Sequence, residues 1–571
     1  MPSIRITQFA GLLPEVNPKA LRNDHAQIAH NCLLWDGWLR PMPQWTVVSS
    51  FATQPRSLIK LHSAPAGFFV SDFVDQGIFV ENEPYTVNYV GLLNGVISKV
   101  IGTSIFHVGL PIPPINAAVQ TVTPNFLSTY PIPRTYAITF LSDASESPPF
   151  VLPELGALGD VFEGDIINLS LTVNVGALAN YHITGYRLYR TVPQFDTGEQ
   201  IGNPAETGFH LVTDVTLFGA PPPMIAYSDT RSSEQIPGDL LLTDQFMEPT
   251  LNTSFLRQTE SGWLVAVEPA VTPITVPSVI QISERYLWDA WPPQNTVRLP
   301  ANVTGVTVFY DDVFFGTLDY PYHMRIEMGD NDALNLSIRP FPDEYRCVPN
   351  TLVTTNFGAM YASPDGLVAL QVQGDHMLSK KVTNPGDQLG GQNIRIDSAL
   401  QGMWWNGNYF GLCDSVGYVF NVPNESTNEF PLAQLVTIDV PHGSIGATVV
   451  TGSGLFALWG TNLYTFPLPG YGYDTAPKMA FRWKSRRYVL PGMYTMAAAK
   501  VVNDGSGTLT FTAIGDGQII ISRAVTDSDP FRFPHQHKVI EWEFVLEGTS
   551  VVSELHVATS IRELTEEPGG G

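Results

Sequence analysis

Cysteine is scarce in this 571-residue sequence and occurs only at Cys32, Cys347 and Cys413. The three residues lie far apart, are odd in number and form no Cys-x-x-Cys pair, so a disulfide framework and a cysteine-rich zinc site are both excluded. Isolated cysteines of this kind are ordinarily small buried residues. We therefore expect three buried, reduced thiols in a chain that folds in a cytoplasm.

Long apolar stretches are absent as well. No run approaches the roughly 18–20 apolar residues that a membrane-spanning helix needs. The opening residues, MPSIRITQFAGLLPEVNPK, contain no continuous apolar core of the kind found in a secretory signal peptide. These absences argue against a membrane span and against secretion through a signal peptide.

Positive charge is in short supply, with 30 Lys and Arg against 54 Asp and Glu and a formal net charge of −24. Such a surface repels nucleic acid and anionic membranes except at local basic patches. Two interpretations stay open: simple solubility, or a lumen through which DNA slides without sticking. The basic cluster Lys484, Arg486 and Arg487 is either a solvated strand edge or a contact with an acidic neighbouring subunit.

Amphipathic helical patterns are nearly missing too, whereas the chain holds 48 Gly and 46 Pro. Hydrophobic residues make up 44% of the sequence, which is typical of a globular protein. Many short strands joined by tight turns account for this combination. The sequence therefore predicts an all-β protein.

A repeated phrase supports a more specific fold. A β-rich run, a tight turn and a second β-rich run recur from Phe255 to Phe466. Successive turn anchors are 46 to 50 residues apart, at Gly262, Asp312, Gly358, Gly407 and Gly454. A period of this length with several strands per unit is typical of a β-propeller. Residues 56–110 resemble the later units, so about six blades are expected, closed by strands from both chain ends.

The remaining chain divides around these repeats. In RTYAITFLSD, Tyr136, Ile138 and Phe140 alternate on one face, and the strands that follow predict an inserted β-sandwich of the immunoglobulin or fibronectin type III kind. A second β-sandwich is expected at the C-terminus. The expected plan is an N-terminal docking arm (1–55), a first propeller segment (56–120), the insert (121–243), the remaining blades (244–480), the C-terminal sandwich (481–566) and a disordered tail (567–571).

The first 55 residues are predicted to be an irregular arm. Loosely helical spacing of apolar residues favours a few helical turns from Ala20 to Cys32. Asp36-Gly37 is a hairpin-turn dipeptide, which Leu39, Arg40 and Pro41 follow.

Catalytic motifs are few and isolated. Asp196-Thr197-Gly198 occurs once, although aspartic protease chemistry needs two carboxylates. Four further candidates each have a structural explanation as well. Ser363–Gly366 resembles an Asp-box turn, His535 and His537 could bind a metal, and Asp330–Asp332 could belong to a calcium loop. The aromatic group Trp404, Trp405, Tyr409 and Phe410 is either a sugar platform or the core of a blade. No G-x-S-x-G, P-loop or HExxH motif is present. We therefore predict no enzyme, no cofactor and no metal.

The opening FAGLLPEVNPKALRNDHAQIAHNCLLWDGWLRPMP resembles the start of tail tubular protein B, the tail nozzle protein of short-tailed bacteriophages. The matching positions are Gly11, Pro18, Gln27, Asn31, Gly37, Leu39, Arg40 and Pro41. TYAITFLSDASESPP with ITGYRLYRT and YSDT, and the stretch from TDSDPFRFP to SIREL, resemble phage virion proteins that share this opening.

This resemblance implies a structural subunit of the virion tail. It implies a hexameric ring at the distal end of the tail, a propeller-containing subunit, and a central channel for ejected DNA. It also implies an adaptor ring and tail fibre or spike proteins as partners. We therefore predict that deletion of residues 1–40 leaves a folded protein that fails to join tails. The fibronectin-like insert departs from the best-known nozzles.

Two other classes stay open beside the nozzle. One is a glycan-binding adhesin or fibre-anchoring module, which an exposed aromatic patch on the propeller would favour. The other is a propeller glycosidase or depolymerase, which several Asp-box repeats would favour, whereas the sequence holds one weak trace.

Overall fold

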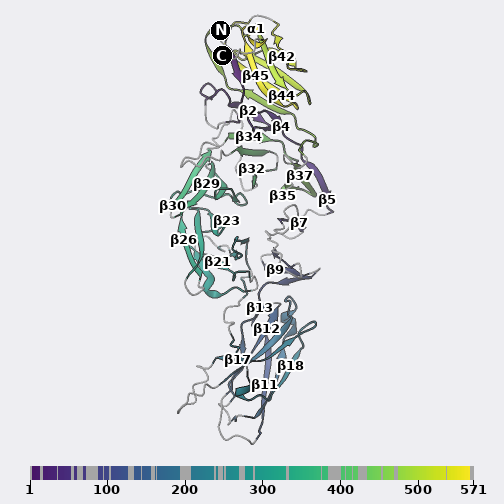
Figure 1. The fold of residues 1–571 in the computed structure, drawn as a ribbon, viewed down its shortest axis with the longest axis vertical. Helices are drawn as coiled ribbons and strands as arrows, with labels where there is room; N and C mark the ends of the chain where they lie inside the picture. The colour runs from purple at the N-terminus through teal and green to yellow at the C-terminus, as the bar shows by residue number, and fades with distance from the viewer. Residues whose placement is uncertain are drawn as a thin grey trace. The chain divides into compact units, whose positions relative to one another are not determined.

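A computed structural model describes residues 3–565 in two compact units, one of residues 1–74, 301–326 and 337–571 and the other of residues 75–300 and 327–336. Within this range the structure leaves out several segments, namely residues 13–16, 35, 53–56, 61–67, 72–87, 94–95, 102–103, 126–133, 143–144, 156–160, 163, 193–207, 237–238, 242–247, 250–251, 269, 271–276, 287–289, 330–333, 365, 375, 384–399, 406, 415, 422–433, 452–453, 468–472 and 535–536. In the described part, β-strands make up nearly all regular structure, with one short α-helix, α1 (Arg562–Thr565) (Figure 1).

The five sequence repeats form antiparallel units of the propeller type; the first four supply four strands each, the fourth of these within a larger sheet, and the fifth supplies three. The first two are β19 (Phe255–Gln258), β20 (Leu264–Glu268), β21 (Ser278–Ile282) and β22 (Thr296–Leu299), then β23 (Val303–Phe309), β24 (Asp312–Thr317), β25 (Tyr322–Met328) and β26 (Leu334–Pro340). The third and fourth are β27 (Val353–Thr354), β28 (Ala359–Ser363), β29 (Gly366–Gln373) and β30 (His376–Thr383), then β31 (Gln401–Trp405), β32 (Asn408–Leu412), β33 (Gly417–Asn421) and β34 (Gln434–Ile438). The predicted all-β propeller fold is confirmed.

The fifth sheet closes with a strand from the start of the chain. It holds β35 (Ile445–Thr451), β36 (Gly454–Trp459), β37 (Asn462–Pro467) and, antiparallel to β37, β5 (Thr46–Ser50). A strand from near the start of the chain therefore completes this sheet, and closure of the whole propeller stays a prediction. Residues 56–110 contribute the pair β6 (Ser57–Lys60) and β7 (Phe68–Ser71) and the sheet of β8 (Asn88–Leu93), β9 (Val96–Ile101) and β10 (Ser104–His107).

Positive backbone φ angles explain three of the five turn anchors. Gly262, Gly358 and Gly407 have φ of 93°, 148° and 78°, a region that favours glycine. Gly262 also lies against Tyr286, and a Cβ there would meet the Tyr286 ring at 2.2 Å. Asp312 and Gly454 instead begin strands β24 and β36.

The insert is a two-sheet sandwich. One sheet holds β12 (Tyr136–Ser142), β13 (Ser145–Glu146), β14 (Phe150–Val151), β16 (Gly185–Thr191) and β17 (Phe209–Thr216), and the other holds β11 (Ile115–Thr123), β15 (Ile166–Val173) and β18 (Met224–Asp229). Tyr136, Ile138 and Phe140 share the buried core between the sheets, as their alternation predicts. The insert begins at β11 and so before the predicted boundary at residue 121.

The C-terminal domain is also built from two sheets. Its strands are β38 (Phe481–Ser485), β39 (Tyr488–Tyr494), β40 (Ala498–Asn503), β41 (Leu509–Gly515), β42 (Gln518–Ala524), β43 (Phe531–Arg532), β44 (Val539–Gly548) and β45 (Val552–Ala558). One sheet follows the order β1-β45-β40-β43, where β1 is Ile4–Ile6. The other runs without a break into the fourth blade, in the order β31-β32-β33-β34-β2-β38-β44-β41-β42.

The joining strand, β2 (Ala26–His30), overturns one sequence expectation. Helical turns are predicted from Ala20 to Cys32, whereas the structure has non-helical turns up to Asp24 and then strand β2. Ala29 and His30 pair with Trp483 and Arg482 on β38, so the strand is fixed by partners far away in sequence. The hairpin expected around Asp36-Gly37 is present, because β3 (Cys32–Leu33) pairs with β4 (Arg40–Pro41).

Candidate functional site

The N-terminal segment, residues 3–50, is tied into the rest of its unit at three places. Strand β1 pairs with β45, β2 lies between β34 and β38, and β5 pairs with β37. Figure 1 shows both chain ends beside β45. The expectation of an irregular arm is wrong in its structure, because the segment supplies strands to the C-terminal domain and to two blades.

The residues that carry the family resemblance hold this segment in place. Gly11 lies against β34: its N–H donates to Gln434 Oε1 at 3.1 Å, and a Cβ would stand 2.7 Å from the carbonyl oxygen of Leu435. Leu39 is fully buried and pairs through its backbone with Val552. Glycine at position 11 is therefore required by the close approach of two backbones.

The side chain of Asn31 joins the end of the fourth blade to the start of the C-terminal domain. Its φ is 54°, a left-handed conformation that asparagine tolerates. The Nδ2 amide donates to Asp439 Oδ2 at 2.8 Å and to the carbonyl of Ala480 at 3.2 Å, and Oδ1 accepts the Asp439 N–H at 2.9 Å. Three of its hydrogen bonds are thus made within this chain.

Pro18, Gly37 and Pro41 contribute backbone carbonyls or turns. The Arg487 N–H donates to the carbonyl of Pro18, and the Tyr473 hydroxyl donates to that of Pro41. Gly37 has φ of 79° and its carbonyl accepts the Phe9 N–H at 2.8 Å. Pro18 and Pro41 thus bind residues outside the segment, whereas Gly37 organises the segment itself.

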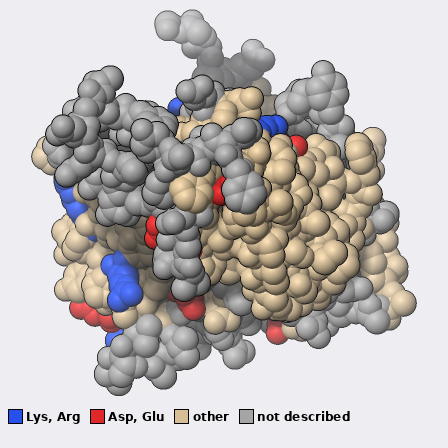
Figure 2. Space-filling view, turned by 90° about the horizontal axis from the view of Figure 1, so that it is seen from below, with Lys and Arg blue, Asp and Glu red and all other residues tan. Residues whose placement is uncertain are grey.

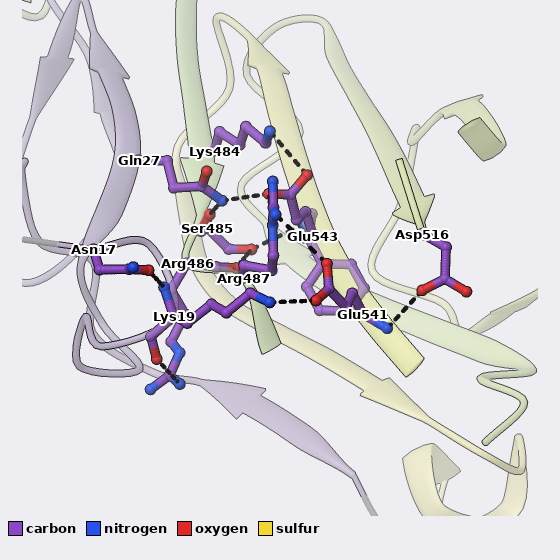
Figure 3. Close-up of polar contacts among 11 residues, drawn as sticks. Asn17, Lys19, Gln27, Lys484, Ser485, Arg486, Arg487, Asp516, Glu541 and Glu543 are labelled. Atoms are coloured by element: carbon purple, nitrogen blue, oxygen red, sulfur yellow. Dashed lines mark hydrogen bonds and ion pairs between the residues drawn. The ribbon is translucent and has the colours of Figure 1, made fainter. Parts of the chain in front are cut away.

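Figure 3 shows how Gln27 and the predicted basic cluster meet two glutamates of β44. Gln27 Nε2 donates to Glu543 Oε1 and to the carbonyl of Ser485, both at 2.7 Å. Lys484 Nζ lies 2.9 Å from Glu543 Oε2, and Arg487 Nε lies 3.0 Å from Glu543 Oε1. The acidic partner of these cations therefore lies on the same chain.

The second glutamate completes this cluster. Glu541 accepts from Lys19 Nζ at 2.5 Å and pairs with Arg487 at 3.5 Å (Figure 3). Arg486 donates to Asn23 Oδ1 and to the carbonyl of Lys19. All three basic side chains bind groups of their own chain, and the contact of Lys484, Arg486 and Arg487 with a neighbouring subunit stays a prediction. Sequence reasoning missed Glu541 and Glu543, although their alternation in EWEF places both on one face.

The pKa of Glu543 is lowered in this cluster. Burial alone raises the pKa of this carboxyl, and the hydrogen bonds from Gln27, Lys484 and Arg487 together outweigh that effect. A carboxyl with a depressed folded-state pKa stabilises the fold above its unfolded pKa of about 4.3 and loses that contribution as the pH falls through the folded value.

Acidification should therefore release the N-terminal segment from β38 and β44. Urea unfolding of the full chain followed between pH 7 and pH 3 is expected to show a falling unfolding free energy below about pH 4.3. Glu543→Gln should flatten that fall. Glu547→Gln, whose ion pair with Arg482 is exposed, is the matched control and should keep it. An equal pH profile for wild type and Glu543→Gln would contradict this role.

The turn between β3 and β4 carries an exposed aromatic residue. Trp38 is 45% exposed, and the Arg40 guanidinium lies 4.9 Å from the centre of its ring. Arg40 is held in turn by Asp36, with Nη2 2.5 Å from Oδ2. We call Asp36, Trp38 and Arg40 the hairpin tip; its charged and aromatic groups lie at the surface, while Leu39 points into the core.

The other sequence candidates fall in different places. Cys32, Cys347 and Cys413 are buried free thiols, as predicted, and burial raises the pKa of Cys347 to about 12. Tyr409 and Phe410 are buried and Trp404 and Trp405 pack against the same core, which favours the core interpretation of this group over the sugar platform. Residues 196–198, 330–332, Asp365 and His535 lie outside the described residues.

The part of the chain that the structure describes offers few groups for metal binding or catalysis. The described residues contain no group of three or more His, Cys, Asp and Glu that is placed to hold a metal ion. Among the same residues, no helix is long and apolar enough to cross a membrane. The arrangement in the N-terminal segment is one of mechanical attachment.

No family model and no curated protein matches this sequence. Several solved structures are similar at low identity. The CNH domain of AfRom2 is 9% identical, with 74% of this chain and 99% of that chain covered and a TM-score of 0.27. BamB from Moraxella catarrhalis is 11% identical (62% and 97% covered, TM-score 0.22), and exo-β-1,3-galactanase from Phanerochaete chrysosporium is 10% identical (53% and 94%, TM-score 0.20). At these TM-scores the similarities carry no functional argument, and the fold assignment rests on the sheets of this chain.

Proposed function

We propose that this chain is a non-catalytic structural subunit of the tail nozzle of a short-tailed bacteriophage. The observation that carries the proposal is the N-terminal segment, whose nozzle-like residues bind the fourth blade and the C-terminal domain together. A nozzle wall needs such stiffness, and one unbroken sheet from β31 to β42 supplies it. The subunit assembles in the host cytoplasm and resides in the virion tail.

The proposed assembly is a ring, six copies in the expected form, around the DNA channel. A head-to-tail interface gives a closed ring when its rotation closes. The net charge of −24 supports rapid passage of DNA, since a wall poor in Lys and Arg offers few phosphate contacts. The partners are an adaptor ring on the portal side and tail fibre or spike proteins. Contact with the host surface at the distal end is part of the same proposal.

Immunogold labelling of intact virions tests this function directly. Antibodies against the full chain should label the distal tip of the tail and leave capsids and fibre ends unlabelled. Label on fibre ends alone would instead support the adhesin, and absence from purified virions would contradict a structural role.

The hairpin tip is an exposed part of the N-terminal segment, and the proposal places the contact with the adaptor ring there. We expect Trp38→Ala with Arg40→Ala to leave the melting temperature nearly unchanged, because exposed substitutions usually alter stability by less than about 0.5 kcal/mol. Incorporation into tails, measured by sedimentation of tails with the added chain, should fall at least about tenfold, as loss of a central aromatic contact at an interface costs 2 kcal/mol or more. Val489→Ala, at an equally exposed apolar residue outside the segment, is the control. Normal incorporation of the double variant would place docking elsewhere.

A further inference from the structure

The three-stranded sheet of the insert is almost free of charge. Its strands β11, β15 and β18 contain one charged residue, Asp229. That carboxylate is fully buried and lies 2.6 Å from Arg190 Nη1, whose side chain is also fully buried. On a chain of net charge −24, this sheet is a neutral surface.

The outer face of this sheet carries uncharged side chains, most of them small, with Val119 and Met224 as exposed apolar residues. Ser228 donates to Asn168 Oδ1 at 2.6 Å, and Asn168 Nδ2 donates to Thr123 Oγ1 at 3.2 Å, so polar groups on all three strands bind one another. A shallow hollow of about 290 Å³ lies on the face, lined among others by Val119, Thr121, Asn168, Ser170, Ala226 and Ser228. The view in Figure 2 shows described surface that is mostly uncharged, with Lys, Arg, Asp and Glu in small separate groups.

Both edges of the sheet are open within the described residues. There, β11 and β18 each pair with β15 alone. Proteins ordinarily protect such edges with Lys, Pro or bulges. Strand β11 has nine residues with no charge and no proline, and one irregularity near its start, between Ile115 and Ala117.

We propose that edge β11 of one copy pairs with edge β18 of a second copy of this chain. The inference rests on the proposed ring and names its subunit contact. Two copies that each carry −24 repel one another over most of their surface, and this sheet offers an approach without that repulsion. Pairing β11 with β18 satisfies both open edges of every copy, whereas pairing β11 with β11 leaves each β18 open.

Other occupants fit this sheet less well. A sugar ring is usually held by an aromatic side chain, and the residues that line the hollow include one, Tyr227, which packs toward the insert core. A basic peptide finds no carboxylate on the outer face of these strands. Pairing with a second neutral edge uses the backbone N–H and C=O groups that the open edge strands present.

Disulfide trapping with the full chain tests this contact. Four double variants combine Val119→Cys or Thr121→Cys with Ala226→Cys or Ser228→Cys. All four positions lie on the outer face of the sheet, so the set tests different alignments of β11 with β18 in which the outer faces of both copies point to the same side. The native cysteines are all buried, so background cross-linking is expected to be low. Under mild oxidation, at least one double variant should give a ladder of covalent oligomers that ends at the ring size, both in solution and on tails.

The controls separate this contact from the proposed function. Each single cysteine variant, and Val175→Cys with Ala226→Cys, should give no ladder, because Val175 is exposed in the same insert but outside the sheet. A covalent dimer from Val119→Cys alone would overturn the head-to-tail pairing. Rings seen by electron microscopy without any ladder would overturn the β11–β18 contact and leave the nozzle standing. A chain that is monomeric in solution and on tails would overturn both.

Discussion

A chain that lacks residues 1–40 will not fold its C-terminal domain and fourth blade into a stable unit. This result is the opposite of what an independent docking arm predicts. The deletion removes β2 from the middle of the ten-stranded sheet and β1 from the edge of the other C-terminal sheet. It also exposes the neighbours of the buried apolar residues Ile4, Ile6, Phe9, Leu12, Leu21, Ala26, Ala29, Cys32, Leu33 and Leu39.

The size of this effect follows from burial. Each fully buried Ile, Leu or Phe side chain stabilises a fold by about 1.5–3 kcal/mol. The seven buried Ile, Leu and Phe residues that the deletion removes together contribute about 10–20 kcal/mol, which is as large as the 5–15 kcal/mol by which proteins are usually stable. Limited proteolysis and urea unfolding of the deleted chain will show early cleavage and no cooperative transition for this unit.

The control for this experiment removes only residues 1–3, which precede β1. That chain should unfold like the intact protein. A cooperative transition of normal midpoint in the 1–40 deletion would mean that the N-terminal segment is only attached to the surface, and would restore its interpretation as a docking arm.

Replacement of Trp483 by alanine is expected to be the most destabilising of the single substitutions considered. Trp483 is fully buried on β38, its ring lies 5.0 Å from that of Phe9 in an edge-to-face contact, and its Nε1 donates to the carbonyl of Ala10 at 3.2 Å. A buried Trp→Ala change costs about 3–5 kcal/mol through lost packing and the cavity that remains. We expect a loss of this size in the urea unfolding free energy.

Trp38→Ala provides the matched control, since Trp38 belongs to the N-terminal segment but is 45% exposed. Its effect on stability should stay below about 0.5 kcal/mol. Protease cleavage within residues 1–40 of folded Trp483→Ala should also become faster, because the anchor of Phe9 is lost. Similar stability of the two tryptophan variants would show that the N-terminal segment does not share the core of the C-terminal domain.

The propeller could be predicted because its signals are local. A blade repeats every 46 to 50 residues, and glycines such as Gly262 and Gly407 mark turns where φ is positive. Alternation of Tyr136, Ile138 and Phe140 likewise gave a strand of the insert, as side chains two apart lie on one face of a sheet. These features depend on neighbours in sequence.

Strand β2 could not be predicted in the same way. AQIAH has no strong strand preference, and its conformation is set by β38, about 450 residues later in the chain. The candidate site shows the same limit. Gln27 and Asn31 were identified through resemblance, but their partners Glu543 and Asp439 are more than 400 residues away. The basic cluster was found in sequence, and its opposite charges on the nearby strand β44 were overlooked.

The mass of the purified chain in solution, followed by electron-microscopic averaging of the same sample and of assembled tails, tests the proposed nozzle most directly. A mass of six times the 62.7 kDa of one chain, with a ring whose hole admits a DNA duplex, is the predicted result. Some tail proteins form rings only on the tail, so if the purified chain is a monomer, the images of assembled tails provide the test. A monomer in solution together with tails that carry no ring of this chain would contradict the account.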